Sequence, residues 1–229
     1  MNSHKIIIGV VIVILIYLLY LYFFGDSTTV LEGMHDAAVE SVIPASSLAP
    51  AVGSANYTYS IWIFVANWNT GAPKVIFERP GDDSGTYAPK MAFSADLNNI
   101  DITLATYDPS KPIMCQVANV PLQSWTNIIM TINGQALDLY LDGKLVRTCL
   151  MSGIPKPSSR SLTLTPSGKS FQGYTSNFRY INNNVNPREA YAIYKEGYQS
   201  GNWLSGMFNK YRIKMSFLED NVEVNSFEI

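Results

Sequence analysis

The stretch from Gln123 to Cys149 limits the fold more than any other part of the chain, because apolar residues alternate with other residues along most of it. In a β-strand, every second side chain lies on the same face. Two dipeptides, Asn133-Gly134 and Asp142-Gly143, interrupt the alternation, and both are typical of two-residue hairpin turns. The sequence therefore predicts a β-meander of three strands, with one face formed by Ile128, Met130, Ile132, Leu137, Leu139 and Leu141.

Similar strand patterns, separated by turn-rich segments, occur before and after this meander. They cover residues 59–65, 74–78, 90–94, 100–106, 113–117, 161–165, 171–181, 211–219 and 222–229. Together with the meander, this makes eleven or twelve strands, a number that suits a two-sheet sandwich better than an eight-stranded barrel. The last two strands alternate around Asp220-Asn221, which predicts a C-terminal hairpin.

One short helix is predicted near the C-terminal end of the domain. Asn186 can cap it, Pro187 suits the first helical position, and Glu189 can complete a capping box. Gly197 is expected to end it, since glycine adopts the positive φ that commonly follows a helix.

Several of these motifs resemble a known family. Trp125 with residues 140–144 resembles the central hairpin of the concanavalin A-like jelly roll, in its laminin-G-like branch. Residues 171–174 (Phe-Gln-Gly-Tyr) resemble the start of another strand of that branch, and residues 186–190 its short helix. The resemblance implies an all-β, two-sheet antiparallel jelly-roll sandwich over residues 55–229.

A narrower resemblance rests on residues 141–149 and on residues 208–214. Both are similar to segments of membrane-anchored virion and minor capsid proteins of large double-stranded DNA viruses. This resemblance implies a structural role at the interface between an internal viral membrane and the capsid, with capsid or other virion proteins as partners.

The apolar run Ile6–Phe24 predicts a single transmembrane helix, so residues 1–25 are interpreted as a membrane anchor. At about 1.5 Å per residue, this run comes close to the thickness of the hydrocarbon core, about 30 Å. A cleaved signal peptide is the alternative, but its apolar core is shorter and small residues follow it. Residues 26–54, rich in Ala, Ser, Pro and Val, are interpreted as a stalk that either holds the domain off the bilayer or lies along its edge as a strand.

Composition and residue types exclude several functions. The formal net charge of −2 provides no basic surplus for a nucleic acid. Both histidines, His4 and His35, lie outside the predicted domain, which excludes a Ser-His-Asp triad and a histidine-based zinc site within it. The E-x-D-x-x-E pattern of glycosidases is missing, so the chain is not expected to be an enzyme or to need a cofactor. The pair Asp82-Asp83 is interpreted as solvated loop carboxylates instead of a calcium site.

Two cysteines and four tryptophans remain as candidate site residues. Cys115 and Cys149 either form a disulfide or stay buried as free thiols; an extracytoplasmic domain, or a viral lineage with its own thiol oxidation machinery, favours the disulfide. Trp68 and Trp203 follow turn residues and are the predicted exposed partner-binding residues. Trp62 and Trp125 lie in strand patterns and are expected in the core.

Two functions fit these observations. The first is a noncatalytic structural protein that tethers the internal membrane of a virus particle to capsid proteins through its jelly roll. The second is a membrane-anchored lectin that binds a glycan through exposed aromatic rings. The resemblance to virion proteins favours the first.

Overall fold

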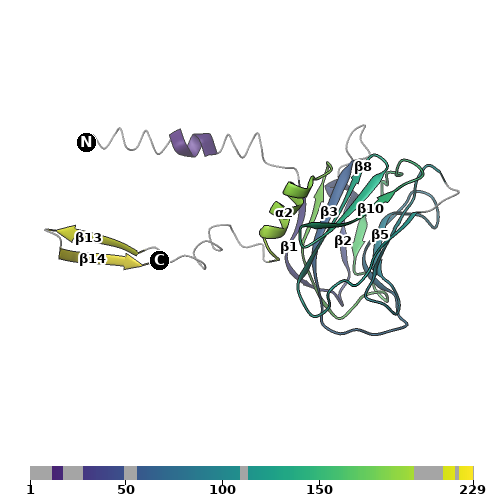
Figure 1. Cartoon of the computed structure of the whole chain (residues 1–229), viewed down its shortest axis with the longest axis horizontal. Helices are drawn as coiled ribbons and strands as arrows, with labels where there is room; N and C mark the ends of the chain where they lie inside the picture. The colour runs from purple at the N-terminus through teal and green to yellow at the C-terminus, as the bar shows by residue number, and fades with distance from the viewer. Residues whose placement is uncertain are drawn as a thin grey trace.

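The protein is an antiparallel β-sandwich of two six-stranded sheets in the computed structural model, which describes residues 12–17, 28–48, 56–108, 113–198, 214–219 and 222–228 (Figure 1). Sheet A has the order β1 (Thr28–Asp36), β12 (Gly173–Ile181), β3 (Tyr57–Val65), β8 (Thr126–Asn133), β9 (Ala136–Leu141) and β10 (Lys144–Leu150). Sheet B has the order β2 (Ser41–Ile43), β11 (Leu162–Leu164), β4 (Lys74–Pro80), β5 (Tyr87–Phe93), β6 (Ile100–Leu104) and β7 (Ile113–Val117). The predicted all-β two-sheet architecture is confirmed.

The core lies between the two sheets and follows from the alternation in the sequence. The predicted meander face is buried, with Ile128, Met130, Ile132, Leu137 and Leu139 all in the core. Aromatic rings fill its centre, where Tyr59 contacts Phe77 at 5.3 Å and Phe178 at 5.9 Å between ring centroids. The turn after β9 places Asp142 at φ 49° and Gly143 at φ 72°, which is the positive φ that its Asp-Gly sequence tolerates.

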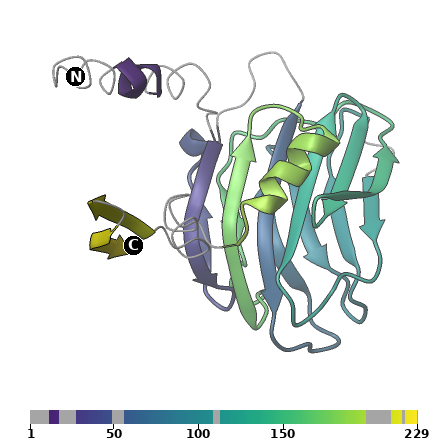
Figure 2. The ribbon, with the colours of Figure 1, turned by 60° about the vertical axis from the view of Figure 1, so that its left-hand side comes forward.

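The short helix α2 (Pro187–Lys195) lies across the outer face of sheet A (Figure 2). The predicted capping box is present: the Asn186 side chain accepts hydrogen bonds from the Arg188 and Glu189 amides, and the Glu189 carboxylate accepts from the Asn186 amide at 2.8 Å. A second, smaller core between α2 and the sheet contains Ile129, Tyr140, Val185 and Ala190. The helix therefore gives sheet A a covered outer face.

The segment interpreted as a stalk lies along the edges of the two sheets, which is the second of its two predicted arrangements, so the sandwich begins before residue 55. Residues 28–36 form β1 along β12, residues 41–43 form β2 along β11, and η1 (Ala45–Ser47) follows. Ala37 and Leu48 are fully buried, so this segment contributes to the core. A register shift between Leu31 and Met34 breaks the two-residue alternation, which explains why the bounds of β1 were not predicted. His35 consequently lies within the sandwich, in β1, and not outside it.

The two ends of the chain are described only in part. Residues 12–17 are helical, and among the described residues no helix is long and apolar enough to cross a membrane. The rest of the predicted span, residues 6–11 and 18–24, lies outside the described residues. The predicted C-terminal hairpin is confirmed as β13 (Lys214–Glu219) paired with β14 (Val222–Glu228), which form a separate two-stranded sheet. Its predicted turn, Asp220-Asn221, lies outside the described residues.

A disulfide joins Cys115 on β7 to Cys149 on β10, with 6.0 Å between their Cα atoms. Each of these strands is the last strand of its sheet, so the bond connects the free edges of sheets A and B. It ties together two strands that are 34 residues apart in the sequence.

We expect the Cys115→Ala/Cys149→Ala double variant to lose stability, because it releases a long loop in the unfolded state. The chain-entropy model gives a loss of about 4 kcal/mol for a loop of this length. Denaturant unfolding of the full chain in detergent, with and without reductant, measures it. Reductant should destabilise the wild type and leave the stability of the double variant unchanged. Equal stability of the two proteins without reductant would contradict the prediction.

Removing β1 and β2 should damage the fold far more than removing the predicted anchor. A chain beginning at residue 26 should melt cooperatively, whereas a chain beginning at residue 55 should lose cooperative melting or fail to stay soluble, because β11 and β12 lose strand partners. Thermal melting followed by circular dichroism compares the two. Equal melting temperatures would show that residues 26–54 are a stalk after all.

Candidate functional site

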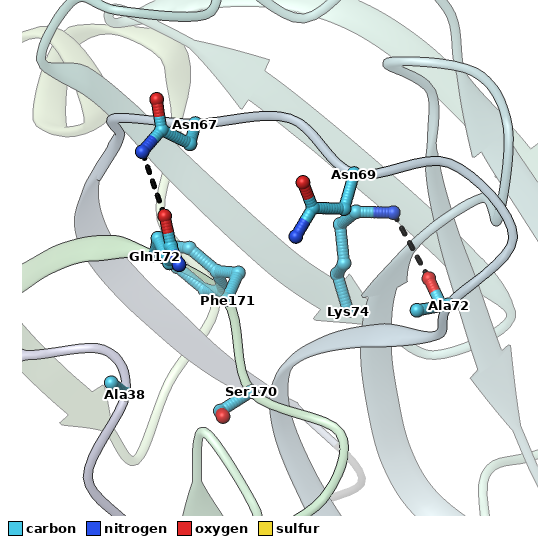
Figure 3. Close-up of a pocket in the computed structure, with 8 residues that line it drawn as sticks. All are labelled: Ala38, Asn67, Asn69, Ala72, Lys74, Ser170, Phe171 and Gln172. Atoms are coloured by element: carbon cyan, nitrogen blue, oxygen red, sulfur yellow. Dashed lines mark hydrogen bonds between the residues drawn. The ribbon is translucent and has the colours of Figure 1, made fainter.

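A pocket of ≈ 270 Å³ opens at one end of the sandwich, where three loops meet (Figure 3). The loops follow β1, follow β3 and precede β12, and strand pairing brings them together: Asp36 lies opposite Tyr174, and Val65 lies opposite Gly173. We call it the rim pocket and define it by its lining residues, Ala38, Asn67, Asn69, Ala72, Lys74, Ser170, Phe171 and Gln172.

The residues around Gly173 fix the shape of the rim pocket. The Gln172 carbonyl accepts a hydrogen bond from the Ala66 amide at 2.9 Å, and the Gly173 carbonyl accepts one from the Ala37 amide at 2.9 Å. A Cβ atom at position 173 would collide with the Phe64 carbonyl oxygen, so only glycine allows this approach. Phe171 consequently points into the core, 6.1 Å from the Phe93 ring, and Gln172 points outward.

Carboxamides provide the hydrogen-bonding groups at the mouth of the rim pocket. Asn67 Nδ2 donates to Gln172 Oε1 at 2.7 Å, and both side chains are exposed, as is Asn69, which lines the same pocket (Figure 3). A carboxamide has two N–H donors and an oxygen with two acceptor positions. The bond between Asn67 and Gln172 therefore leaves the Gln172 amino group and the Asn67 oxygen able to bind a ligand.

Lys74 forms the charged part of the pocket wall. Only 3% of this residue is exposed, and its Nζ donates to the Ala72 carbonyl at 2.9 Å and the Ala95 carbonyl at 3.1 Å. Burial lowers the pKa of the Lys74 ammonium group, and the nearby Asp96 carboxylate opposes that shift. Nζ also lies 4.2 Å from the centre of the Trp68 ring, a cation–π contact. Lys74 thus links the loop after β3, through Ala72, to the loop after β5, through Ala95.

The described tryptophans match the predictions only in part. Trp68 is half-buried and packs edge-to-face on Phe93 at 5.4 Å, so it supports the pocket wall instead of presenting an exposed ring to a partner. Trp203 lies outside the described residues. Trp62 is buried, but on the outer face of sheet A, where it stacks on Tyr194 at 5.6 Å. Trp125 is half-buried on the same face.

The loop carboxylates of Asp82 and Asp83 contact polar groups of another loop of the protein. The Asp82 carboxylate accepts hydrogen bonds from the Ser159 amide at 3.1 Å and hydroxyl at 2.8 Å, which lower its pKa. Asp83 forms an ion pair with Lys156 at 2.7 Å. The described residues contain no group of three or more His, Cys, Asp or Glu side chains that could hold a metal ion.

The sequence contained partial signals for the rim pocket. The motif at residues 171–174 locates Phe171 and Gln172, and the Asn-Trp-Asn turn locates Asn67 and Asn69. Nothing in the sequence indicated that these two loops meet, because 105 residues separate Asn67 from Gln172. The eight lining residues include no carboxylate, imidazole or thiol, so they can bind a polar ligand but cannot supply an acid and base pair.

Comparison with solved structures shows the fold in larger proteins. The binding domain of botulinum neurotoxin DC in complex with rat synaptotagmin II aligns with a TM-score of 0.56 and 11% identity, over 74% of this chain and 46% of that one. The same domain in complex with SialylT aligns with a TM-score of 0.54 and 12% identity, over 74% of this chain and 46% of that one. A third structure, whose description states that cell entry of botulinum neurotoxin type C depends on interaction with two ganglioside molecules, aligns with a TM-score of 0.50 and 14% identity. The alignment covers 62% of this chain and 35% of that one. The chain thus spans less than half of each of these proteins.

No curated protein matches the sequence closely. A family match, however, covers residues 40–191, which is 152 of the 229 residues and includes the strands from β2 to β12. The expected fold family is confirmed by this match, and the chain belongs to the concanavalin A-like lectin/glucanases superfamily, in its laminin-G-like branch.

Proposed function

We propose that this chain is a membrane-anchored, noncatalytic binding protein whose rim pocket recognises a glycan. The observation that carries the proposal is the set of exposed carboxamides of Asn67, Asn69 and Gln172 around one pocket. Sugar hydroxyls both donate and accept hydrogen bonds, and a carboxamide offers both donors and an acceptor. Phe171 and two alanines supply the apolar part of the lining.

The direction of β1 supports display of this pocket away from a membrane. Only three residues separate the apolar run ending at Phe24 from β1, a gap of at most about 14 Å even when extended. β1 then runs for nine residues, about 30 Å, from Thr28 beside Ile181 to Asp36 beside Tyr174. The rim pocket lies just beyond Asp36. If residues 6–24 span a bilayer, the pocket lies at the end of the sandwich that is farther from the membrane.

The structural neighbours are consistent with a binding role. Their descriptions name complexes with rat synaptotagmin II and with SialylT, and cell entry dependent on interaction with two ganglioside molecules. In this chain the lack of carboxylates in the pocket supports the same reading, because a glycosidase needs two of them on either side of the scissile bond. We therefore expect no glycan turnover.

A second candidate is the tether between the internal membrane of a virus particle and its capsid proteins. The short connection from the apolar run to β1 favours it, because a domain held close to the bilayer can set a fixed distance to a protein shell. In this function, the rim of the sandwich contacts a capsid protein and no glycan is required. The two candidates share the anchor and differ only in the ligand at the rim.

The Gln172→Ala and Asn67→Ala variants should each lose glycan binding by at least about tenfold, because each removes a hydrogen-bonding pair from the pocket mouth. The full chain, purified in detergent, is applied to an array of neutral and sialylated glycans, and the variants are compared on the strongest ligand.

Gln135→Ala is the matched control, since Gln135 is an exposed amide in the turn between β8 and β9, at the opposite end of sheet A. It should bind as the wild type does. If the wild-type chain binds no glycan but co-purifies with capsid proteins from detergent-treated particles, the tether replaces the lectin function. Measurable hydrolysis of any bound glycan would show that the protein is an enzyme.

A further inference from the structure

Three aromatic side chains lie on the outer face of sheet A at the same end as the rim pocket. Phe64 near the end of β3 is paired with Tyr174 near the start of β12, and their ring centroids are 6.4 Å apart. The Trp125 ring lies 5.7 Å from the Phe64 ring on the other side. We call Phe64, Trp125 and Tyr174 the aromatic patch.

The aromatic patch is packed on one side and open on the other. Trp125 stacks on Tyr198 with 4.5 Å between centroids and an interplanar angle of 6°. Gln123 holds the loop before β8 against the end of β3, because its amide donates to the Val65 carbonyl at 3.0 Å. Tyr174, in contrast, keeps 43% of its surface exposed. Tyr174 is therefore the exposed ring of this packed aromatic group, whereas Phe64 and Trp125 are half-buried.

The aromatic patch adjoins the rim pocket along the chain and across the sheet. Tyr174 follows Gln172 by two residues, and strand alternation places both side chains on the outer side. Asn67, which bonds to Gln172, follows Phe64 by three residues along the neighbouring segment. Carboxamides in the rim pocket and the exposed Tyr174 ring thus lie at the same end of the molecule.

Resting on the proposed glycan-binding function, we propose that the ligand is a neutral oligosaccharide that occupies two subsites. One sugar unit binds the carboxamides of the rim pocket, and the next unit stacks its C–H face on the Tyr174 ring. Aromatic rings bind the apolar face of a sugar, whereas its hydroxyls need donors and acceptors at the edge. Neutral sugars are favoured because the only charged residue among those of the pocket and the patch is Lys74, which is buried.

The test compares monosaccharides with trisaccharides of the same unit, using N-acetylglucosamine with chitotriose, and glucose with cellotriose. Isothermal titration calorimetry is performed on the full chain in detergent. The wild type should bind at least one trisaccharide about tenfold more tightly than its monosaccharide, the gain expected for about 1.4 kcal/mol of stacking.

Tyr174→Ala should abolish that gain and leave monosaccharide binding unchanged, whereas Tyr174→Phe should keep the gain because it keeps the ring. Tyr191→Ala is the control, since Tyr191 is similarly exposed, at 49%, but lies on α2.

A trisaccharide gain that survives Tyr174→Ala, or no gain in the wild type, would overturn the second subsite while leaving the rim pocket intact. Loss of monosaccharide and trisaccharide binding together in Gln172→Ala, but not in Tyr174→Ala, would support both subsites. No binding of any of the four sugars by the wild type would overturn this inference, while binding of other glycans on the array would still support the proposed function.

Discussion

The pairing of β12 with β3 at Gly173 is the interaction on which the functional end of this protein depends. Because residue 173 has no side chain, the two backbones approach closely enough for the Gln172 carbonyl to accept a hydrogen bond from the Ala66 amide. That contact directs Phe171 into the core and Gln172 outward. The same pairing sets Tyr174 beside Phe64. The rim pocket and the aromatic patch are therefore two consequences of one strand register.

The sandwich behind this end is held together mainly by burial of the two inner sheet faces. Two further connections reinforce it at its sides. The disulfide between β7 and β10 joins the two sheets at one pair of edges. At the other pair, the N-terminal segment contributes β1 to sheet A and β2 to sheet B, with Ala37 buried between them. Residues 28–48 thus close the sandwich on the side from which the predicted anchor leaves.

Strand alternation and turn dipeptides predicted twelve of the fourteen strands in the described part of the chain, the capped helix and the C-terminal hairpin, because each of these depends on local sequence. The sequence allowed a strand along the domain's edge before residue 55 but did not place β1 and β2, since a bulge interrupts the first and the second has only three residues. The site was less predictable. Trp68 stands in a polar turn, yet the buried Lys74 and Phe93 draw its ring inward, and neither contact is visible in the sequence. The rim pocket also requires a meeting of loops that are far apart along the chain.

The central claim is that a glycan binds at the end of the sandwich formed by Asn67, Asn69 and Gln172. The most direct measurement is an NMR titration of the ¹⁵N-labelled full chain in a lipid nanodisc with the strongest ligand from the glycan array. The largest shifts should fall on the side-chain amide signals of these three residues and on the backbone amides of Ala66 and Gly173. Shifts confined to α2, to the turn between β8 and β9, or to the outer face of sheet B would contradict the claim.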